Sequence, residues 1–173
     1  LWMGFRLLII LLKERPDDPD GWILRGFSLL RQNKSKEAIA CFNHVIQDHP
    51  ENADALHYRA LAEYTSHGDL KQAIQDLLTV RGRDPRRLNS RVLLAKLYRL
   101  TRQFPLAADE YEAVIKLEPD QSSVRVEYAQ FLLSVVEVMD RLSPENRESF
   151  ATTVRAVHVA LGGEGAYTTS LKL

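Results

Sequence analysis

The chain has 173 residues, and 45% of them are apolar, which is enough to build a hydrophobic core of ordinary domain size. Its 23 basic and 23 acidic residues give a formal net charge of zero, so the whole protein has no field that would attract nucleic acid or a membrane. The single cysteine, Cys41, excludes an internal disulfide and a cysteine-rich zinc site.

Residues 1–12, LWMGFRLLIILL, resemble the apolar part of a signal peptide or a membrane anchor. They are too few to span a bilayer, which takes about 20 apolar residues, and they contain Arg6 and no small-residue cleavage site. We therefore expect a helix of the folded domain and no transmembrane segment. The start at Leu1 is compatible with a fragment, so the compartment stays unknown, with a weak preference for the cytoplasm.

The middle of the chain predicts pairs of short helices with an apolar period of three to four residues. Asn33 and the dipeptide His67-Gly68 are turn signals within pairs, and Ser35 is a candidate N-cap. The expected helices, in chain order, cover residues 19–32, 35–48, 53–66, 69–81, 87–101 and 104–117.

These pairs form a repeat array. Proline ends successive units at Pro16, Pro50, Pro85 and Pro119, which lie 34, 35 and 34 residues apart. A period of this length with two helices indicates a solenoid, in which each unit buries its apolar face against its neighbours. Small residues recur at one site of the first helices, Gly26, Ala60, Ala95 and Ala129, and at one site of the second helices, Gly4, Ala38, Ala73 and Ala107.

Large residues follow the second series at fixed steps: Leu8, Phe42, Leu77 and Tyr111 after four residues, then Leu11, Val45, Val80 and Val114. We expect the small residues to allow close helix contact and the large ones to fill the core. One additional residue separates Ala60 from Ala73, and we place it in the turn near Gly68, where an insertion is tolerated.

This pattern resembles the tetratricopeptide repeat family over residues 4 to about 134. The first unit matches it at Trp22, Gly26, Leu29, Ala38, Phe42, Val45 and Pro50. The resemblance implies an all-α fold, a right-handed α-α superhelix of about three full repeats. We expect one domain over residues 1–161, made of a partial repeat at 1–16, repeats at 19–52, 53–87 and 88–121, and capping helices at 121–161, before a flexible tail at 162–173.

The predicted capping pair begins with a helix over residues 121–142, followed by Ser143 and Pro144 as the start of the last helix. Its stretch FLLSVVEVM, residues 131–139, is apolar nearly all round. We expect it to pack against the third repeat and the final helix, or else to form a self-association or partner surface. The tail AYTTSLKL is either disordered or docks in a groove.

In the family, peptides lie in the concave groove lined by the first helices, and one subset binds a C-terminal carboxylate through Lys, Asn and Arg. None of the five corresponding positions holds the residue that the subset has there: this chain has Ile23, Phe27, Tyr58, Asn89 and Leu93, with Asn89 in place of a lysine. Its groove positions are mostly apolar and end in two cations: Ile23, Phe27, Leu30, His57, Leu61, Tyr64, Val92, Lys96 and Arg99. They predict a site for an apolar or amphipathic peptide, although packing between first helices is an alternative for some of them.

Residues 81–102 carry eight basic side chains and one acidic one, Asp84. Besides Lys96 and Arg99, this basic patch consists of Arg81, Arg83, Arg86, Arg87, Arg91 and Arg102. It is either neutralised within the fold, the preferred interpretation, or offered to an acidic partner. Nucleic acid is not the expected partner, because Tyr98, the one aromatic residue in this segment, is at a core position.

No pattern of catalytic or metal-binding residues appears in the sequence, and we predict no enzyme activity and no cofactor or metal. Cys41 has no sign of activation, so we interpret it as a small buried residue. The predicted function is that of a scaffold or adaptor that binds a protein segment. The alternative is a docking or regulatory region of a larger enzyme or of a membrane-anchored assembly factor.

Overall fold

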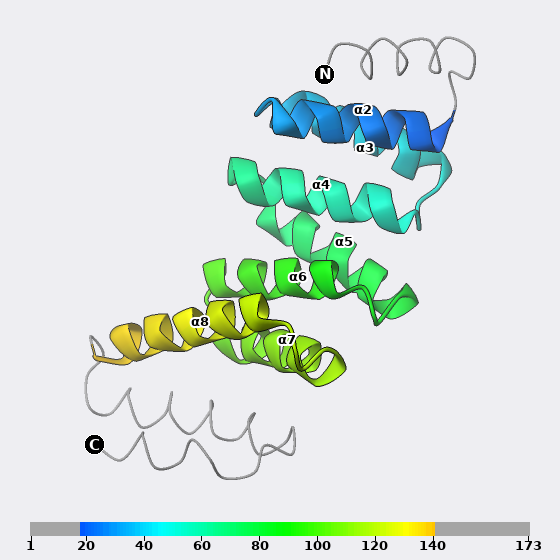
Figure 1. Ribbon diagram of the computed structural model, residues 1–173. Helices are drawn as coiled ribbons and strands as arrows, with labels where there is room; N and C mark the ends of the chain where they lie inside the picture. The colour runs from blue at the N-terminus through cyan, green and yellow to red at the C-terminus, as the bar shows by residue number, and fades with distance from the viewer. Residues whose placement is uncertain (1–17, 141–173) are drawn as a thin grey trace. The chain divides into compact units, whose positions relative to one another are not determined.

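The computed structural model describes residues 18–140, which are all-α, with helices and no strand in this range (Figure 1). The helices are α2 (Pro19–Arg31), α3 (Ser35–Asp48), α4 (Ala53–Ser66), α5 (Leu70–Arg83), α6 (Leu88–Leu100), α7 (Phe104–Leu117) and α8 (Ser122–Asp140). Their bounds agree with the predicted ones to within two residues. The predicted partial repeat at 1–16, the end of the capping pair and the tail at 162–173 lie outside the described residues.

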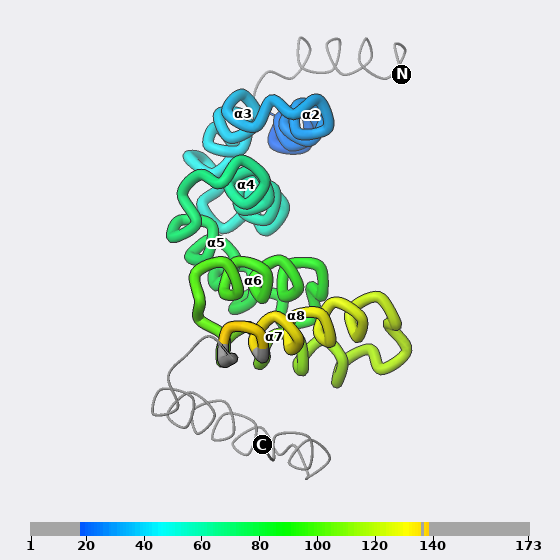
Figure 2. The backbone as a smooth tube through the Cα atoms, turned by 90° about the vertical axis from the view of Figure 1, so that its left-hand side faces the viewer, coloured from blue at the N-terminus to red at the C-terminus, as the bar shows by residue number. Residues whose placement is uncertain are grey.

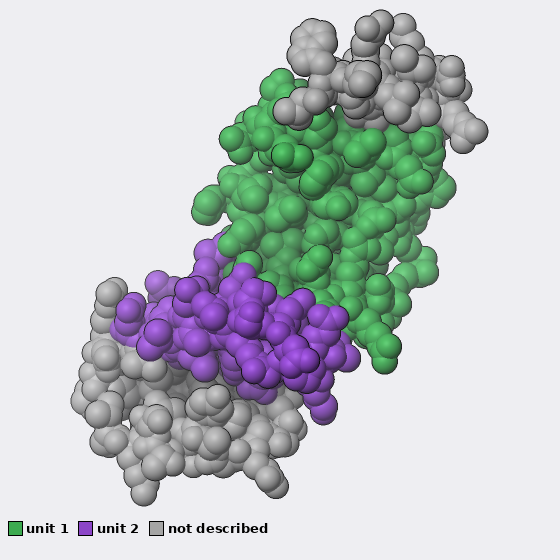
Figure 3. All heavy atoms as spheres, viewed as in Figure 1, with its two compact units in different colours: residues 1–97 green, residues 98–173 purple. Residues whose placement is uncertain are grey.

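The chain divides into two compact units, residues 1–97 and 98–173 (Figure 3). In the first unit, α2 pairs with α3 and α4 pairs with α5, while α3 also packs on α4. Figure 2 shows α2 and α4 on one side of this unit and α3 and α5 on the other. In the second unit, α7 pairs with α8. This helix pairing is the arrangement that the repeat pattern predicts.

The recurring positions form the core, as the sequence predicts. The small residues Ala38, Ala73 and Ala107 have no exposed surface. The large residues that follow them are also buried: Phe42, Leu77, Tyr111, Val45, Val80 and Val114. In the first helices, Gly26, Ala60 and Ala95 are buried, whereas Ala129 is exposed. The small-residue site of α8 therefore does not have the burial of its counterparts.

Each turn within a helix pair contains one residue in the left-handed conformation. These residues are Asn33, His67 and Arg102, with φ of 60°, 51° and 58°. Each follows the small residue of its first helix by seven positions. Two residues, Gly68 and Asp69, separate His67 from α5, whereas one residue does so in the other two pairs. The additional residue of the second repeat thus lies in this turn, where it was predicted.

The N-cap of α3 differs from the predicted one. Ser35 is not its N-cap, because the Lys34 carbonyl already accepts the Ala38 N–H at 3.0 Å and Ser35 lies inside the first turn. Side-chain caps are present elsewhere in this unit. Asn52 accepts from the N–H groups of Asp54 and Ala55 at the start of α4, and Asp69 accepts from Gln72 N–H at the start of α5.

A buried polar network connects three helices of the first unit. Arg59 of α4 donates two hydrogen bonds of 2.7 Å to the Asp76 carboxylate of α5 and one of 2.7 Å to Asn43 Oδ1 of α3. Gln72 Nε2 also donates to Asp76 at 2.8 Å. Because a two-pronged guanidinium–carboxylate pair has a fixed geometry, the Arg59–Asp76 pair fixes how α4 and α5 face each other, and the single bond to Asn43 joins them to the preceding repeat.

Aromatic packing joins the two helices of the second unit. Tyr111 of α7 lies with its ring centroid 5.5 Å from Tyr128 and 5.7 Å from Phe131 of α8. Tyr128 also donates a hydrogen bond of 2.6 Å to Glu112 Oε1. Phe131 and Val135 are buried, while Leu133 is exposed, so the apolar stretch of α8 has one face against α7 and one open face.

Candidate functional site

An open hollow of about 650 Å³ lies between α2, the start of α3 and α4. We call it the α2–α4 hollow. Three of the predicted groove residues, Phe27 and Leu30 of α2 and Leu61 of α4, line it together. The other lining residues are Arg31, Asn33, Lys34, Ser35, Lys36, Glu37, Thr65 and Ser66. Residues of two successive repeats therefore contribute to one surface depression.

The apolar side chains that line the α2–α4 hollow pack on aromatic residues beneath them. Phe27 is 37% exposed, and its ring centroid lies 5.3 Å from that of Tyr58. Tyr58 in turn stacks on the fully buried Phe42 ring at 6.0 Å. Leu30 packs against the same buried cluster. Phe27 thus presents a large apolar surface in a position fixed by its neighbours, which is the property of a binding anchor.

The side of the α2–α4 hollow formed by α2 and α3 is basic. Arg31 lies in the last turn of α2, Lys34 in the turn, and Lys36 in the first turn of α3, and all three are exposed. Glu37 is the one carboxylate that lines the hollow. We call Arg31, Lys34 and Lys36 the rim cations; the sequence analysis did not include them. The turn between α2 and α3 brings them to the same hollow as Phe27.

His57, the fourth predicted groove residue in chain order, has another role. It is 9% exposed, and its Nδ1 lies 2.9 Å from the hydroxyl of buried Ser90 of α6. Burial lowers the pKa of His57 to about 4, with a further lowering by Arg87 and an opposing effect of Asp54. His57 is therefore a neutral packing residue between α4 and α6, and we do not include it in the binding surface.

The remaining predicted groove residues are partly buried and do not line the hollow: Ile23, Tyr64, Val92, Lys96 and Arg99. Two exposed apolar residues of α8, Val126 at 56% and Leu133 at 65% exposure, are not among the predicted groove residues, although Leu133 belongs to the apolar stretch 131–139. Val126 follows Val92 by 34 residues, and Leu133 follows Arg99 by the same number. The repeat period therefore places both at positions that correspond to predicted groove residues.

The basic patch is partly neutralised within the first unit, which was the preferred interpretation. Arg83 pairs with Glu51 of the preceding repeat, and Arg87 pairs with Asp54 of α4. Arg91 Nε donates to the Pro85 carbonyl at 2.6 Å. Arg86 and Arg102 are exposed. The pairing of Arg83 and Arg87 reduces the charge that this segment can offer to an acidic partner.

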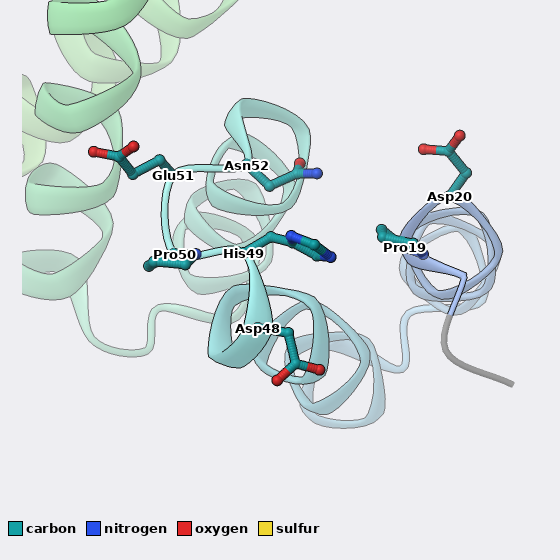
Figure 4. A pocket seen from close by; sticks show the side chains of 7 residues that line it. All are labelled: Pro19, Asp20, Asp48, His49, Pro50, Glu51 and Asn52. Atoms are coloured by element: carbon teal, nitrogen blue, oxygen red, sulfur yellow. The ribbon is translucent and has the colours of Figure 1, made fainter.

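A second hollow, of about 510 Å³, lies between the start of α2 and the turn from α3 to α4 (Figure 4). Asp20, Asp48, His49 and Glu51 line it, but Figure 4 shows that the carboxylates of Asp20, Asp48 and Glu51 do not point toward a common centre. Within residues 18–140, no group of three or more His, Cys, Asp or Glu side chains is arranged to hold a metal ion. We therefore do not take this hollow as a binding site.

Cys41 is 4% exposed, and burial raises the pKa of its thiol, as expected of a packing residue and not of a nucleophile. Among the described helices, none combines the length and apolar character needed to cross a membrane. The α2–α4 hollow is thus the surface feature of the described residues in which predicted binding positions come together.

The solved structures most similar to this chain include three helical repeat domains. The first tetratricopeptide domain of Spaghetti (RPAP3), bound to the HSP90 peptide SRMEEVD, has a TM-score of 0.63 at 19% identity, covering 68% of this chain and 93% of the other. The Sgt2 domain from Aspergillus fumigatus gives 0.65 at 18%, covering 73% and 84%. MamA from Desulfovibrio magneticus RS-1 gives 0.68 at 15%, covering 93% and 85%.

No curated protein matches the sequence significantly. The sequence profile described as tetratricopeptide repeat matches residues 23–87, the segment that holds α2 to α5 and the whole α2–α4 hollow. Taken with the helix pairing and the buried small residues, this identifies residues 23–87 as tetratricopeptide repeats, and the structural matches show the same fold.

Proposed function

We propose that this protein is a non-enzymatic interaction module that holds an apolar or amphipathic segment of a protein partner on the first-helix side of its repeats. One observation carries this proposal: Phe27, Leu30 and Leu61, three predicted groove residues from two repeats, line the same open hollow. An apolar depression with a fixed aromatic floor is suited to the anchor side chain of a bound segment.

Related folds support a peptide as the ligand. The Spaghetti (RPAP3) domain binds an HSP90 peptide, and the second domain of human RPAP3 was solved in complex with an HSP70 peptide. The carboxylate-binding residues of that subset are replaced here by Ile23, Phe27, Tyr58, Asn89 and Leu93. We therefore expect an internal apolar segment to bind, through contacts with Phe27 and its neighbours.

The test is selection from a display library of random twelve-residue peptides on the immobilised protein, followed by fluorescence anisotropy with the selected peptides. The double variant Phe27→Ala with Leu61→Ala, which removes one lining side chain from each repeat, is expected to lose binding by at least tenfold, while its helix content in circular dichroism stays unchanged. Leu24→Ala is the matched control, because Leu24 is 51% exposed on the same helix but does not line the hollow. Selected peptides that bind the double variant as well as the wild type would contradict the proposal.

A further inference from the structure

Unlike several other basic residues of the first unit, the rim cations have no acidic partner among the described residues. Arg59, Arg83 and Arg87 each form an ion pair with a carboxylate. Arg31, Lys34 and Lys36 form none with any described residue, although they lie within six positions of one another. Three cations and one carboxylate, Glu37, line this hollow, so its lining has a net charge of +2 in a protein whose net charge is zero.

The charge around the α2–α4 hollow is also one-sided. The rim cations all belong to the α2–α3 side, whereas α4 contributes Leu61, Thr65 and Ser66. The hydroxyls of Thr65 and Ser66 both donate to the Ala62 carbonyl, at 3.1 and 2.7 Å, and so have no hydrogen left for a ligand. A ligand in the hollow therefore meets apolar contacts on the α4 side and positive charge on the α2–α3 side.

We propose that the α2–α4 hollow selects acidic partner segments, in which a large apolar side chain is flanked by aspartate or glutamate. The apolar side chain rests against Phe27, Leu30 and Leu61, and the flanking carboxylates lie beside the rim cations. This inference rests on the proposed function and adds the chemistry of the partner. Such a segment needs no free C-terminal carboxylate, because the rim cations lie beside an apolar anchor site.

Exposed ion pairs contribute little to affinity individually, so the rim cations act mainly on specificity and on the rate of association. Replacing the flanking acidic residues of a bound peptide by their amides is expected to weaken binding about three- to tenfold at low salt. The effect should shrink as salt is added, because exposed charges are screened. Apolar contacts with Phe27 should keep the neutral peptide measurably bound.

The experiment uses the display library of random twelve-residue peptides on three forms of the full chain. These are the wild type, the variant Lys34→Glu with Lys36→Glu, and the control Lys71→Glu with Arg86→Glu. Both variants change exposed residues and shift the net charge by the same amount, but Lys71 and Arg86 do not line the hollow. Unchanged circular dichroism spectra and urea midpoints verify that each variant is folded.

Peptides selected on the wild type and on the control are expected to carry acidic residues around one large apolar residue. Peptides selected on the Lys34/Lys36 variant should keep the apolar residue and lose the acidic ones. Selected peptides that depend on Phe27 but show no acidic enrichment, or the same enrichment on all three forms, would overturn this inference and leave the proposed function intact. Selection of no peptide, or only of peptides indifferent to Phe27→Ala, would overturn both.

Discussion

The backbone of Gly26 lies directly against the ring of Phe42, so closely that a methyl group added to Gly26 would sit 2.5 Å from Phe42 Cε1. Phe42 is fully buried and belongs to the core cluster with Ala38 and Ala62. Its ring therefore has no free space into which it can move. The absence of a side chain at residue 26 sets the distance between α2 and α3.

Gly26→Ala is expected to destabilise the protein by about 1–2 kcal/mol. Alanine favours the helix by about 1 kcal/mol over glycine, but overpacking of a fixed core residue costs about 1–3 kcal/mol. Gly82→Ala is the control, because Gly82 lies in α5 with no atom within 4 Å of the added methyl group, and it should stabilise by about 0.5–1 kcal/mol. Urea unfolding measures both, and equal signs would contradict the packing argument.

Asp76→Ala is expected to lower the free energy of unfolding by about 2–3 kcal/mol. The Asp76 carboxylate is 3% exposed, and its removal leaves the guanidinium of Arg59, which is 15% exposed, without its charge partner. Thermal and urea denaturation give the change. Glu51→Ala removes an ion pair with Arg83 whose side chains are about half exposed, and a loss below about 0.5 kcal/mol is expected there.

Stability should depend on pH through His57. Its pKa in the folded protein is lowered to about 4 from 6.5, so the unfolded chain binds a proton at a higher pH than the folded one does. The stabilising contribution of neutral His57 is therefore present above pH 6.5 and is lost as the pH falls toward 4, by roughly 3 kcal/mol in total.

The variant His57→Gln isolates this contribution from those of the other titrating groups. Urea unfolding of wild type and variant at several pH values between 7 and 4 gives the difference between them. The wild type should lose more stability than the variant over this range. Parallel curves for the two proteins would show that His57 titrates normally in the folded state.

Two residues of α8 test how this helix packs on α7. Phe131 is 1% exposed and contacts the ring of Tyr111, whereas Leu133 is 65% exposed. Phe131→Ala should cost about 3 kcal/mol, because it removes a buried aromatic ring, and Leu133→Ala should change stability by less than about 0.5 kcal/mol. Denaturation curves of the two variants that coincide would rule out the observed orientation of α8.

The framework of the repeats was predictable because it depends on positions that recur. Ala38, Ala73 and Ala107 recur because only a small side chain fits between two packed helices, and every repeat has the same requirement. A feature with such a cause appears several times in one sequence. For the same reason, the period places Val126 and Leu133 of α8 in the groove series, a step that the sequence analysis did not take.

The parts of the site and of the helix caps that could not be predicted depend on contacts that occur only once in the chain. The rim cations are separated from Leu61 by some 25 or more residues, and no repeat period connects them with it. His57 has the sequence position of a groove residue, but its contact with Ser90 of the next repeat buries it. Ser35 has the residue type of a cap, but a left-handed residue at Asn33 starts α3 one residue earlier. Such pairings are decided by tertiary contacts.

The turn with the additional residue has a practical consequence. Around exposed Gly68, the Glu63 carboxylate accepts the Asp69 N–H at 2.8 Å, so the longer turn is closed by its own hydrogen bonds without any core residue. Exposed turns of this kind tolerate foreign sequence. A fluorophore attached at this turn would therefore leave the core positions of α4 and α5 unchanged, and it would lie next in the chain to Thr65 and Ser66, which line the α2–α4 hollow.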